Sequence, residues 1–246
     1  MALLSPEAFD NNICNATIYG LGLELARELL LRDFYVVACR KNPEETQVEE
    51  MMALFPDHMA ILPLDIGDDK SVAALENQVA ALVPHLDLLV NNAGILGDMQ
   101  KILGDDLDYT EMLQVLNVNA VGTLRVTNAL CGLVMKSTLK MIVNISSEAG
   151  SIQDCFRQGW FGYCMSKSAN NMQSALVHNN IKKDGGRVVV IHPGHVATYM
   201  RGHLDTTARI TATESAKSIL KVVLDKPLPV EERPLYLDYR GVRLPW

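Results

Sequence analysis

Residues 187–194 read Arg-Val-Val-Val-Ile-His-Pro-Gly, and they give the clearest sign of how this chain is built. Val188–Ile191 is an uninterrupted apolar run of β-branched residues, which is typical of a strand buried on both faces of a parallel sheet. Similar short runs alternate with longer helical patterns on either side of it. This alternation predicts a doubly wound α/β fold, in which a mostly parallel, seven-stranded sheet carries helices on both faces.

The expected strands lie at Phe34–Cys39, Ala60–Leu64, Leu86–Val90, Met141–Ile145, Arg187–Ile191 and Pro234–Leu237. The expected helices lie near Leu21–Leu31, Ser71–Leu82, Tyr109–Met135, Trp160–Lys182 and Thr213–Leu224. The first strand is the weak point, because Phe9–Asn15 holds three asparagines and an aspartate, which are poor strand formers. No linker, repeat or low-complexity segment divides the chain, so we expect residues 1–246 to form a single domain.

Composition excludes several classes of protein. The formal net charge of −7 argues against sequence-independent binding to nucleic acid. No apolar stretch approaches the ~18 residues of a membrane span, and the N-terminus has neither the basic flank nor the apolar core of a signal peptide. The five cysteines are scattered without a Cys-x-x-Cys pair, so neither a metal site nor a disulfide framework is indicated. We therefore expect a cytoplasmic protein with no nucleic-acid or membrane partner.

Tyr163 and Lys167 lie four residues apart in a segment expected to be helical, so their side chains share one face. A nearby ammonium group favours the phenolate and lowers the pKa of a tyrosine from its usual value of about 10. Such a phenol can protonate the alkoxide that forms when hydride reaches a carbonyl carbon. An ordinary amphipathic surface pair would show the same spacing.

The turn from Asn15 to Gly22 could hold a pyrophosphate. Gly20, Leu21 and Gly22 open the first expected helix, and glycines there let the backbone approach the phosphates at the helix N-terminus. The alternative is a helix start that only happens to contain glycines.

Two further loops fit a dinucleotide. Arg40 and Lys41 end the second strand, where a carboxylate would bind a ribose hydroxyl and a basic residue accommodates a 2′-phosphate, so NADP(H) is favoured over NAD(H). Asn91, Ala93 and Gly94 close the strand at Leu86–Val90, and small residues there let a cofactor lie across the strand ends. Solvated charges and a tight turn are the alternatives for these two loops.

Ordered motifs along nearly the whole chain resemble the short-chain dehydrogenase/reductase family. They are Gly20–Gly22, Asn91–Gly94, Asn119–Gly122, Asn144–Ser147, Tyr163-x-x-x-Lys167 and His192–Thr198. Within that family, three segments are similar to the sniffer-like (C-factor-like) carbonyl reductases: Glu148–Ile152, His192–Gly194 and the tail Leu237–Trp246. The resemblance implies one dinucleotide-binding domain over residues 1–246.

The resemblance also implies catalytic roles. Tyr163 would be the general acid, and Lys167 would lower its pKa and hold the nicotinamide ribose. Ser147 would hydrogen-bond the substrate carbonyl, although Ser146 beside it could instead be the serine concerned. Asn119 would position a water that returns protons from solvent, or it could simply make hydrogen bonds inside a helix.

The cofactor contacts and partners follow from the same resemblance. The residues implied at the adenine ring and at the carboxamide are Asp65, Ile66, Pro193, Gly194, Val196 and Thr198. The chain would act with NADP(H) on a small carbonyl or alcohol. It would do so as a homodimer or homotetramer, assembled through the helices Tyr109–Met135 and Trp160–Lys182.

Departures from the family pattern keep two other readings open. Asn15-Ala16 stands where the family usually has Thr-Gly, and Tyr19 stands where members that prefer NADP often carry a basic residue. This favours, as an alternative, a non-catalytic or weakly cofactor-binding regulatory protein of the same fold. An epimerase or dehydratase of a related fold also carries Tyr-x-x-x-Lys, but such chains are usually longer.

Three other features are less specific. His192 and His195 resemble metal ligands but more simply pack around the Pro-Gly turn. Aromatic residues before Tyr163 could line a substrate mouth or could only pack; they are Phe156, Trp160 and Phe161. Tyr199–Thr211 is either a lid over the substrate or a surface loop.

Overall fold

Parallel strands form the centre of the molecule in the computed structural model, which describes residues 12–15, 20–42 and 47–246. Seven strands pair in the order β3-β2-β1-β4-β5-β6-β7, and every neighbouring pair is parallel. They are β1 (Asn12–Asn15), β2 (Val36–Arg40), β3 (Met59–Pro63), β4 (Leu88–Asn91), β5 (Met141–Ile145), β6 (Arg187–His192) and β7 (Leu235–Asp238). The expected α/β fold with parallel strands is confirmed.

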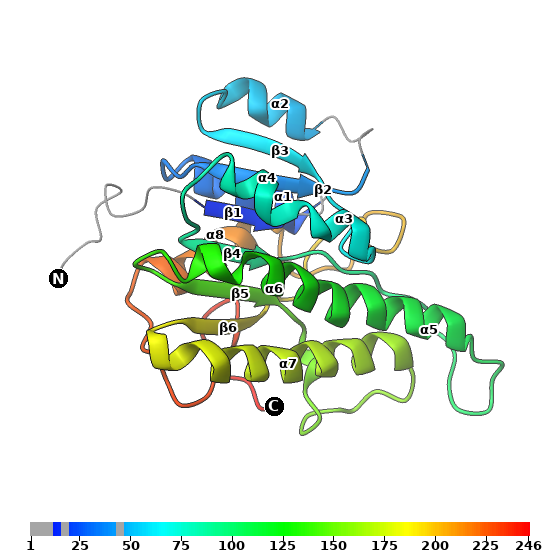
Figure 1. Cartoon of the computed structure of the whole chain (residues 1–246). Helices are drawn as coiled ribbons and strands as arrows, with labels where there is room; N and C mark the ends of the chain where they lie inside the picture. The colour runs from blue at the N-terminus through cyan, green and yellow to red at the C-terminus, as the bar shows by residue number, and fades with distance from the viewer. Residues whose placement is uncertain (1–11, 16–19, 43–46) are drawn as a thin grey trace.

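Helices cover both faces of this sheet (Figure 1). One face carries α1 (Leu21–Leu30), α2 (Gln47–Leu54) and α8 (Ala212–Leu224). The other carries α3 (Asp69–Ala73), α4 (Leu75–Ala80), α6 (Thr123–Val134) and α7 (Phe161–Ile181), and α5 (Tyr109–Leu116) packs against α7. Among the described helices, none is long and apolar enough to cross a membrane.

Two buried apolar clusters explain why this arrangement is stable. Side chains alternate along each strand, so Met141 and Val143 of β5 enter one cluster, while Ile142 enters the other. Leu130 on α6 and Leu25 on α1 are fully buried against opposite faces. Parallel strands covered on both faces favour apolar side chains, and Val188–Ile191 accordingly has no polar position.

The structure differs from the sequence expectation in the first strand and in the first helical segments. β1 is a central strand, paired with both β2 and β4, although its sequence Asn-Ile-Cys-Asn is poor in strand formers. Backbone hydrogen bonding to two neighbours overrides local propensity there. The expected helix Ser71–Leu82 is two short helices that meet at Ala74, and α2 was not expected at all.

The expected helix Tyr109–Met135 is interrupted by a π-helical segment, η2 (Asn117–Gly122). Asp108 is the N-cap of α5, and its carboxylate accepts a hydrogen bond from the Glu111 N–H at 3.0 Å. Wide turns of this kind are frequent at functional sites. Asn119, one of the predicted site residues, lies inside it.

The strand order reverses between β1 and β4, since the chain builds outward from β1 to β3 and then from β4 to β7. In open α/β sheets this switch point leaves a crevice outside the carboxyl ends of the strands, where ligands bind. Most of the predicted site residues follow the carboxyl ends of these strands. Ala16 and Tyr19, the departures in the first turn, lie outside the described residues.

Candidate active site

Tyr163 and Lys167 lie one turn apart on α7, and both are buried, with 8% and 3% of their surface exposed. The Lys167 ammonium donates a hydrogen bond to the Ile145 carbonyl at the end of β5, at 3.0 Å. Its Nζ lies 5.6 Å from the centroid of the Tyr163 ring. The alternative of an exposed amphipathic pair is therefore wrong.

The expected lowering of the Tyr163 pKa is wrong for this structure. Burial raises the pKa of the phenol to about 12, and a hydrogen bond shared with the Ser147 side chain only partly opposes that effect. The Lys167 ammonium, 5.6 Å from the ring centroid, does not outweigh burial. The phenol is therefore protonated at neutral pH, which is the form that a proton donor needs.

The two serines after β5 have different surroundings. The Ser147 side chain is half-buried and lies near enough to Tyr163 to lower the pKa of its phenol, although burial outweighs this effect. Ser146 is buried, and its hydroxyl donates to Asn171 Oδ1 at 2.7 Å. The structure therefore brings Ser147, and not Ser146, to the phenol.

Asn119 joins three elements through its side chain. Its Oδ1 accepts from the Ile95 N–H at 2.8 Å, and its Nδ2 donates to the Ile95 carbonyl at 2.8 Å and to Ser166 Oγ at 2.9 Å. These partners lie outside its own helix, so the alternative of an internal helical hydrogen-bonder is wrong. The proton-return role of Asn119 stays a prediction.

The glycine-containing turn at the start of α1 faces the loop after β6. Gly20 has a φ of +77°, and a Cβ there would lie only 2.7 Å from Thr198 Cγ2. Only glycine fits both the backbone conformation and the close approach. Leu21 and Gly22 are buried in the first turn of α1, so the predicted pyrophosphate turn and the predicted carboxamide anchor Thr198 lie side by side.

The loop after β6 is fixed at several points. The Pro193 carbonyl accepts from Ser215 Oγ at 2.7 Å, Gly194 has a φ of +86°, and Val196 forms a β-bridge with Ile210. His195 Nε2 lies 2.9 Å from the Asp205 carboxylate, so this histidine holds the segment 199–211 in place. Hydrogen bonds from Thr207 and His195 hold the pKa of Asp205 below its usual range.

The residues predicted at the adenosine end all take part in ion pairs or packing. Arg40 pairs with Glu49 on α2, and the Lys41 ammonium lies 2.7 Å from the Asp65 carboxylate. That carboxylate also accepts from the Gly67 N–H at 2.9 Å, and the Lys41 hydrogen bond helps to hold the pKa of Asp65 below its usual range. Ile66 is buried beside it.

Asn91 at the end of β4 has its side chain directed into the protein. Its Nδ2 donates to Thr127 Oγ1 at 3.0 Å and to Asn144 Oδ1 at 2.8 Å, so it joins β4 to α6 and β5. Ala93 packs against the apolar cluster under α6. Gly94 lies next to the Lys167 ammonium, since a Cβ on this glycine would be 3.6 Å from Lys167 Nζ.

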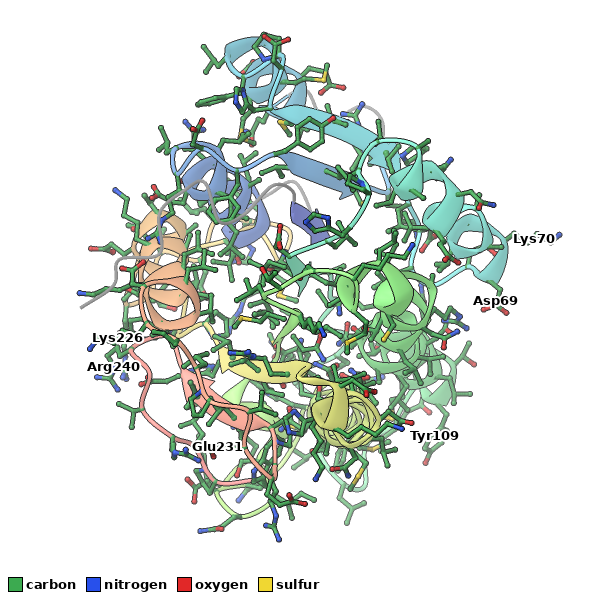
Figure 2. The ribbon with its side chains drawn as sticks, turned by 60° about the vertical axis from the view of Figure 1, so that its left-hand side comes forward. Asp69, Lys70, Tyr109, Lys226, Glu231 and Arg240 are labelled. Carbon is green, nitrogen blue, oxygen red and sulfur yellow. The ribbon has the colours of Figure 1, made fainter. Side chains whose placement is uncertain are left out.

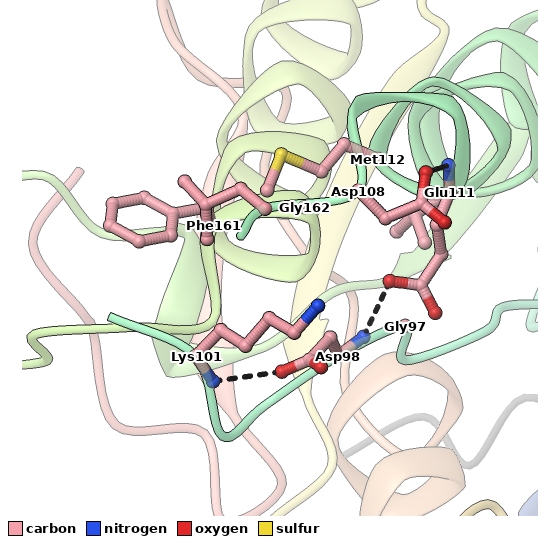
Figure 3. A pocket seen from close by; sticks show the side chains of 10 residues that line it. Gly97, Asp98, Lys101, Asp108, Glu111, Met112, Phe161 and Gly162 are labelled. Atoms are coloured by element: carbon pink, nitrogen blue, oxygen red, sulfur yellow. Dashed lines mark hydrogen bonds between the residues drawn. The ribbon is translucent and has the colours of Figure 1, made fainter. Parts of the chain in front are cut away.

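A small cavity lies between α5 and the loop that follows Gly94 (Figure 3). The Glu111 carboxylate accepts from the Asp98 N–H at 3.0 Å, and the Asp98 carboxylate accepts from the Lys101 N–H at 2.9 Å. Phe161 and Gly162 close the cavity from α7. Its volume of ≈ 10 Å³ has room for one water at most, so it is not a substrate site.

A larger hollow of ≈ 380 Å³ lies beside the start of α7. It is lined by Met99, Gln100, Ile102, Phe156, Arg157, Gln158, Gly159 and Trp160. Trp160 has a φ of +64°, a conformation that costs a bulky residue about 1–3 kcal/mol. Its ring meets the Tyr163 ring edge-on with centroids 6.2 Å apart. Phe156 and Trp160 line the hollow, whereas Phe161 lines the smaller cavity, so the substrate mouth stays a prediction.

Several contacts at this site had no counterpart in the sequence expectation. Asn171 lies two turns after Tyr163, so the row Tyr163, Lys167 and Asn171 follows a four-residue spacing that could have signalled it. Tyr236 on β7 donates from its hydroxyl to the Ser147 carbonyl. His192 lies 4.0 Å from the Glu148 carboxylate, and burial lowers the pKa of this histidine.

Lys167 should make the stability of the protein depend on pH. Burial lowers its pKa from 10.5 to about 8, so between these values the unfolded chain binds more protons and stability rises with pH. From pH 7.5 to pH 9.5 the free energy of unfolding should gain about 2 kcal/mol from this residue. The raised pKa of Tyr163 opposes this gain only above about pH 10.

Urea unfolding of the wild type and of Lys167→Met at several pH values checks this, because all other titrating groups cancel in the difference. The wild type should gain stability relative to the variant as the pH rises. A difference that stays constant from pH 7.5 to 9.5 would contradict the burial of a titrating amine.

Comparison with known proteins agrees with this geometry. Residues 16–209 match the family model described as short chain dehydrogenase. C-signal of Myxococcus xanthus is 34% identical over 161 residues, which cover 65% of this chain and 93% of that protein. The NADPH-bound carbonyl reductase from chicken fatty liver is 27% identical, with a TM-score of 0.85 over 97% of this chain and 99% of that chain.

The Sniffer carbonyl reductase of D. melanogaster has the same fold, with a TM-score of 0.88 at 24% identity, over 97% of this chain and 100% of that one. The chain is thus similar to C-signal in sequence and to Sniffer in fold, in agreement with the expected resemblance. A family match over most of the length and a buried tyrosine–lysine pair at the carboxyl edge of the sheet lead to one conclusion: this chain belongs to the short-chain dehydrogenase family.

Proposed function

We propose that this protein is an NADP(H)-dependent oxidoreductase that reduces a carbonyl to an alcohol by hydride transfer, with Tyr163 as the general acid. The observation that carries the proposal is the buried Tyr163 phenol, which lies beside the Ser147 side chain and has Lys167 Nζ 5.6 Å from its ring centroid. A phenol kept protonated at neutral pH suits reduction, in which a proton must be given to oxygen.

The described residues fit a dinucleotide cofactor. The absence of a side chain at Gly94 leaves space within 4 Å of the Lys167 ammonium, where a nicotinamide ribose would be held. Lys167 spends one of its three N–H donors on Ile145, which leaves two for ribose hydroxyls. Arg40 and Lys41, with Asp65, would take the adenosine end, and the basic pair supports NADP(H) over NAD(H).

A reduced nicotinamide supplies hydride when bound, and the protein supplies orientation and the proton. Tyr163 gives its proton to the carbonyl oxygen, and the Ser147 hydroxyl donates a hydrogen bond to the same oxygen as negative charge develops there. The Lys167 ammonium, 5.6 Å from the centroid of the Tyr163 ring, favours the negative charge that the phenol acquires when it gives up its proton. We place the body of the substrate in the hollow beside Trp160, whose volume lies within the range of small-molecule pockets.

We further propose that residues 1–246 form one domain and that the protein assembles as a homodimer or homotetramer. Apolar side chains point outward from the helices that would make the contact: Leu113 on α5 is 67% exposed, and Met172 and Leu176 on α7 are 63% and 57% exposed. Tyr109, at the start of α5, also lies on the surface (Figure 2). Exposed apolar patches of this kind are typical of interfaces.

Consumption of NADPH with a panel of aldehydes, ketones and diketones tests the function. We expect alcohol to form in step with NADPH oxidation, and isothermal titration should show tighter binding of NADPH than of NADH. Tight NADPH binding without turnover on any carbonyl would favour a regulatory protein of the same fold. Weak binding of both nucleotides would instead show that the turn at Asn15-Ala16 no longer binds the pyrophosphate of the cofactor.

A further inference from the structure

The last residues of the chain fold back along β7. After the turn at Tyr239–Gly241, the Leu244 N–H donates to the Tyr236 carbonyl at 2.8 Å and the Asp238 N–H donates to the Val242 carbonyl at 2.8 Å. The Asp238 carboxylate closes the turn, since it accepts from the Val242 N–H at 2.9 Å. Residues 235–246 therefore form an antiparallel extension of β7, named here the C-terminal hairpin.

Trp246 ties this hairpin to the loop that follows Ser147. The main-chain oxygen of Trp246 accepts from the Gln153 N–H at 3.1 Å and from Ser151 Oγ at 3.3 Å. The Trp246 ring lies on Tyr236, with ring centroids 5.1 Å apart. The end of the hairpin thus contacts the loop and covers the ring of Tyr236.

Tyr236 reaches from β7 to the predicted catalytic serine. Its ring is buried, and its hydroxyl donates to the Ser147 carbonyl. This bond holds the hydroxyl against the main chain of Ser147. It fixes the main chain of Ser147, whose side chain lies beside the Tyr163 phenol.

Asn171 holds the same loop from the side of α7. Its Nδ2 donates to the Gly150 carbonyl at 3.1 Å, and its Oδ1 accepts from Ser146. The loop lies so close to the helix that a Cβ on Gly150 would come within 2.9 Å of the Lys167 carbonyl oxygen. The segment from Ser146 to Gly150 is clamped between α7 and the C-terminal hairpin.

We propose that Tyr236 is a positioning residue for carbonyl reduction, which acts through the main chain of Ser147, and that Trp246 keeps Tyr236 in place. The inference rests on the proposed function, because it needs the Ser147 hydroxyl to contact the substrate oxygen. Two anchors on one residue set where that hydroxyl points: Tyr236 on the carbonyl of Ser147, and the Ala149 N–H, which donates to Ser147 Oγ at 3.2 Å.

Tyr236→Phe removes the hydroxyl and keeps the ring against Trp246. We expect kcat with a carbonyl substrate to fall about tenfold, because a serine displaced by a fraction of an ångström stabilises the alkoxide less well. The KM for NADPH should stay unchanged, since the contact lies on the serine side of the site. In a Ser147→Ala background the same substitution should cause no further loss, because the hydroxyl that it positions is already absent.

Two controls separate positioning from general damage. Tyr35→Phe removes a phenol from a partly buried tyrosine before β2, far from Ser147 in the sheet order, and should leave kcat unchanged. Trp246→Phe should retain most of the activity, whereas Trp246→Ala should reproduce the loss seen in Tyr236→Phe. If Tyr236→Phe fails to fold, the two Trp246 variants test the positioning role in its place.

An unchanged kcat in Tyr236→Phe, or an equal loss with and without the Ser147 hydroxyl, would overturn the positioning role while leaving the proposed reductase intact. If none of the carbonyls on the panel supported NADPH oxidation by the wild-type protein, the proposed function itself would be contradicted, and the positioning role with it.

Discussion

Tyr163→Phe should lower kcat for carbonyl reduction by about 10²- to 10⁴-fold, which is the contribution of a positioned general acid. The substitution deletes one oxygen from a buried ring, so the packing against Trp160 and the fold should survive. The KM for NADPH should change little, because the phenol serves the substrate oxygen. Steady-state kinetics together with a thermal unfolding curve provide the measurement.

Tyr109→Phe is the matched control for this change. Tyr109 is a tyrosine at the surface start of α5, 70% exposed, and its loss of a hydroxyl should leave kcat at the wild-type value. Turnover by Tyr163→Phe at the wild-type rate would remove the general acid from the mechanism proposed above.

Lys167→Met should lower kcat/KM about a hundredfold or more, because it removes the positive charge beside the phenol and the donors for the cofactor ribose. A methionine keeps the length and the burial of the side chain, so the lost interactions are those of the ammonium group. In contrast to Tyr163→Phe, this variant should also raise the Kd for NADPH, which isothermal titration measures directly.

The exposed Lys136, just beyond the end of α6, provides the control, and Lys136→Met should bind NADPH as the wild type does. If Lys167→Met bound NADPH with unchanged affinity and kept its turnover, the buried amine would have only a structural role in tying α7 to the Ile145 carbonyl.

The architecture was readable in the sequence wherever burial dictates composition. Met141–Ile145 has the same bounds in the sequence expectation and in the structure, because a strand buried on both faces favours a short, mainly apolar run, here with Asn144 as its one polar residue. β1 could not be identified this way, since its place in the sheet depends on pairing with two distant strands. The break at Ala74 between α3 and α4 could likewise not be recognised from the periodic pattern of apolar residues.

The candidate site was predictable in part. Spacing placed Tyr163 and Lys167 on one face of a helix, and motif order named Ser147. The direction of the Tyr163 pKa shift was missed, because two buried groups are each desolvated and sequence alone does not reveal how deeply. Tyr236 was missed for another reason: it reaches Ser147 from a strand 89 residues away.

The four-residue row of Tyr163, Lys167 and Asn171 on α7 has a consequence for how such a protein can change. Successive members of the row are about 6 Å apart along a single rigid rod, because an α-helix advances 1.5 Å per residue. The residues that line the hollow beside Trp160, by contrast, sit on loops: Phe156 before the helix, and Met99 and Gln100 after β4. Changes in those loops can therefore admit a different molecule without altering the helical spacing on which the proposed proton transfer depends.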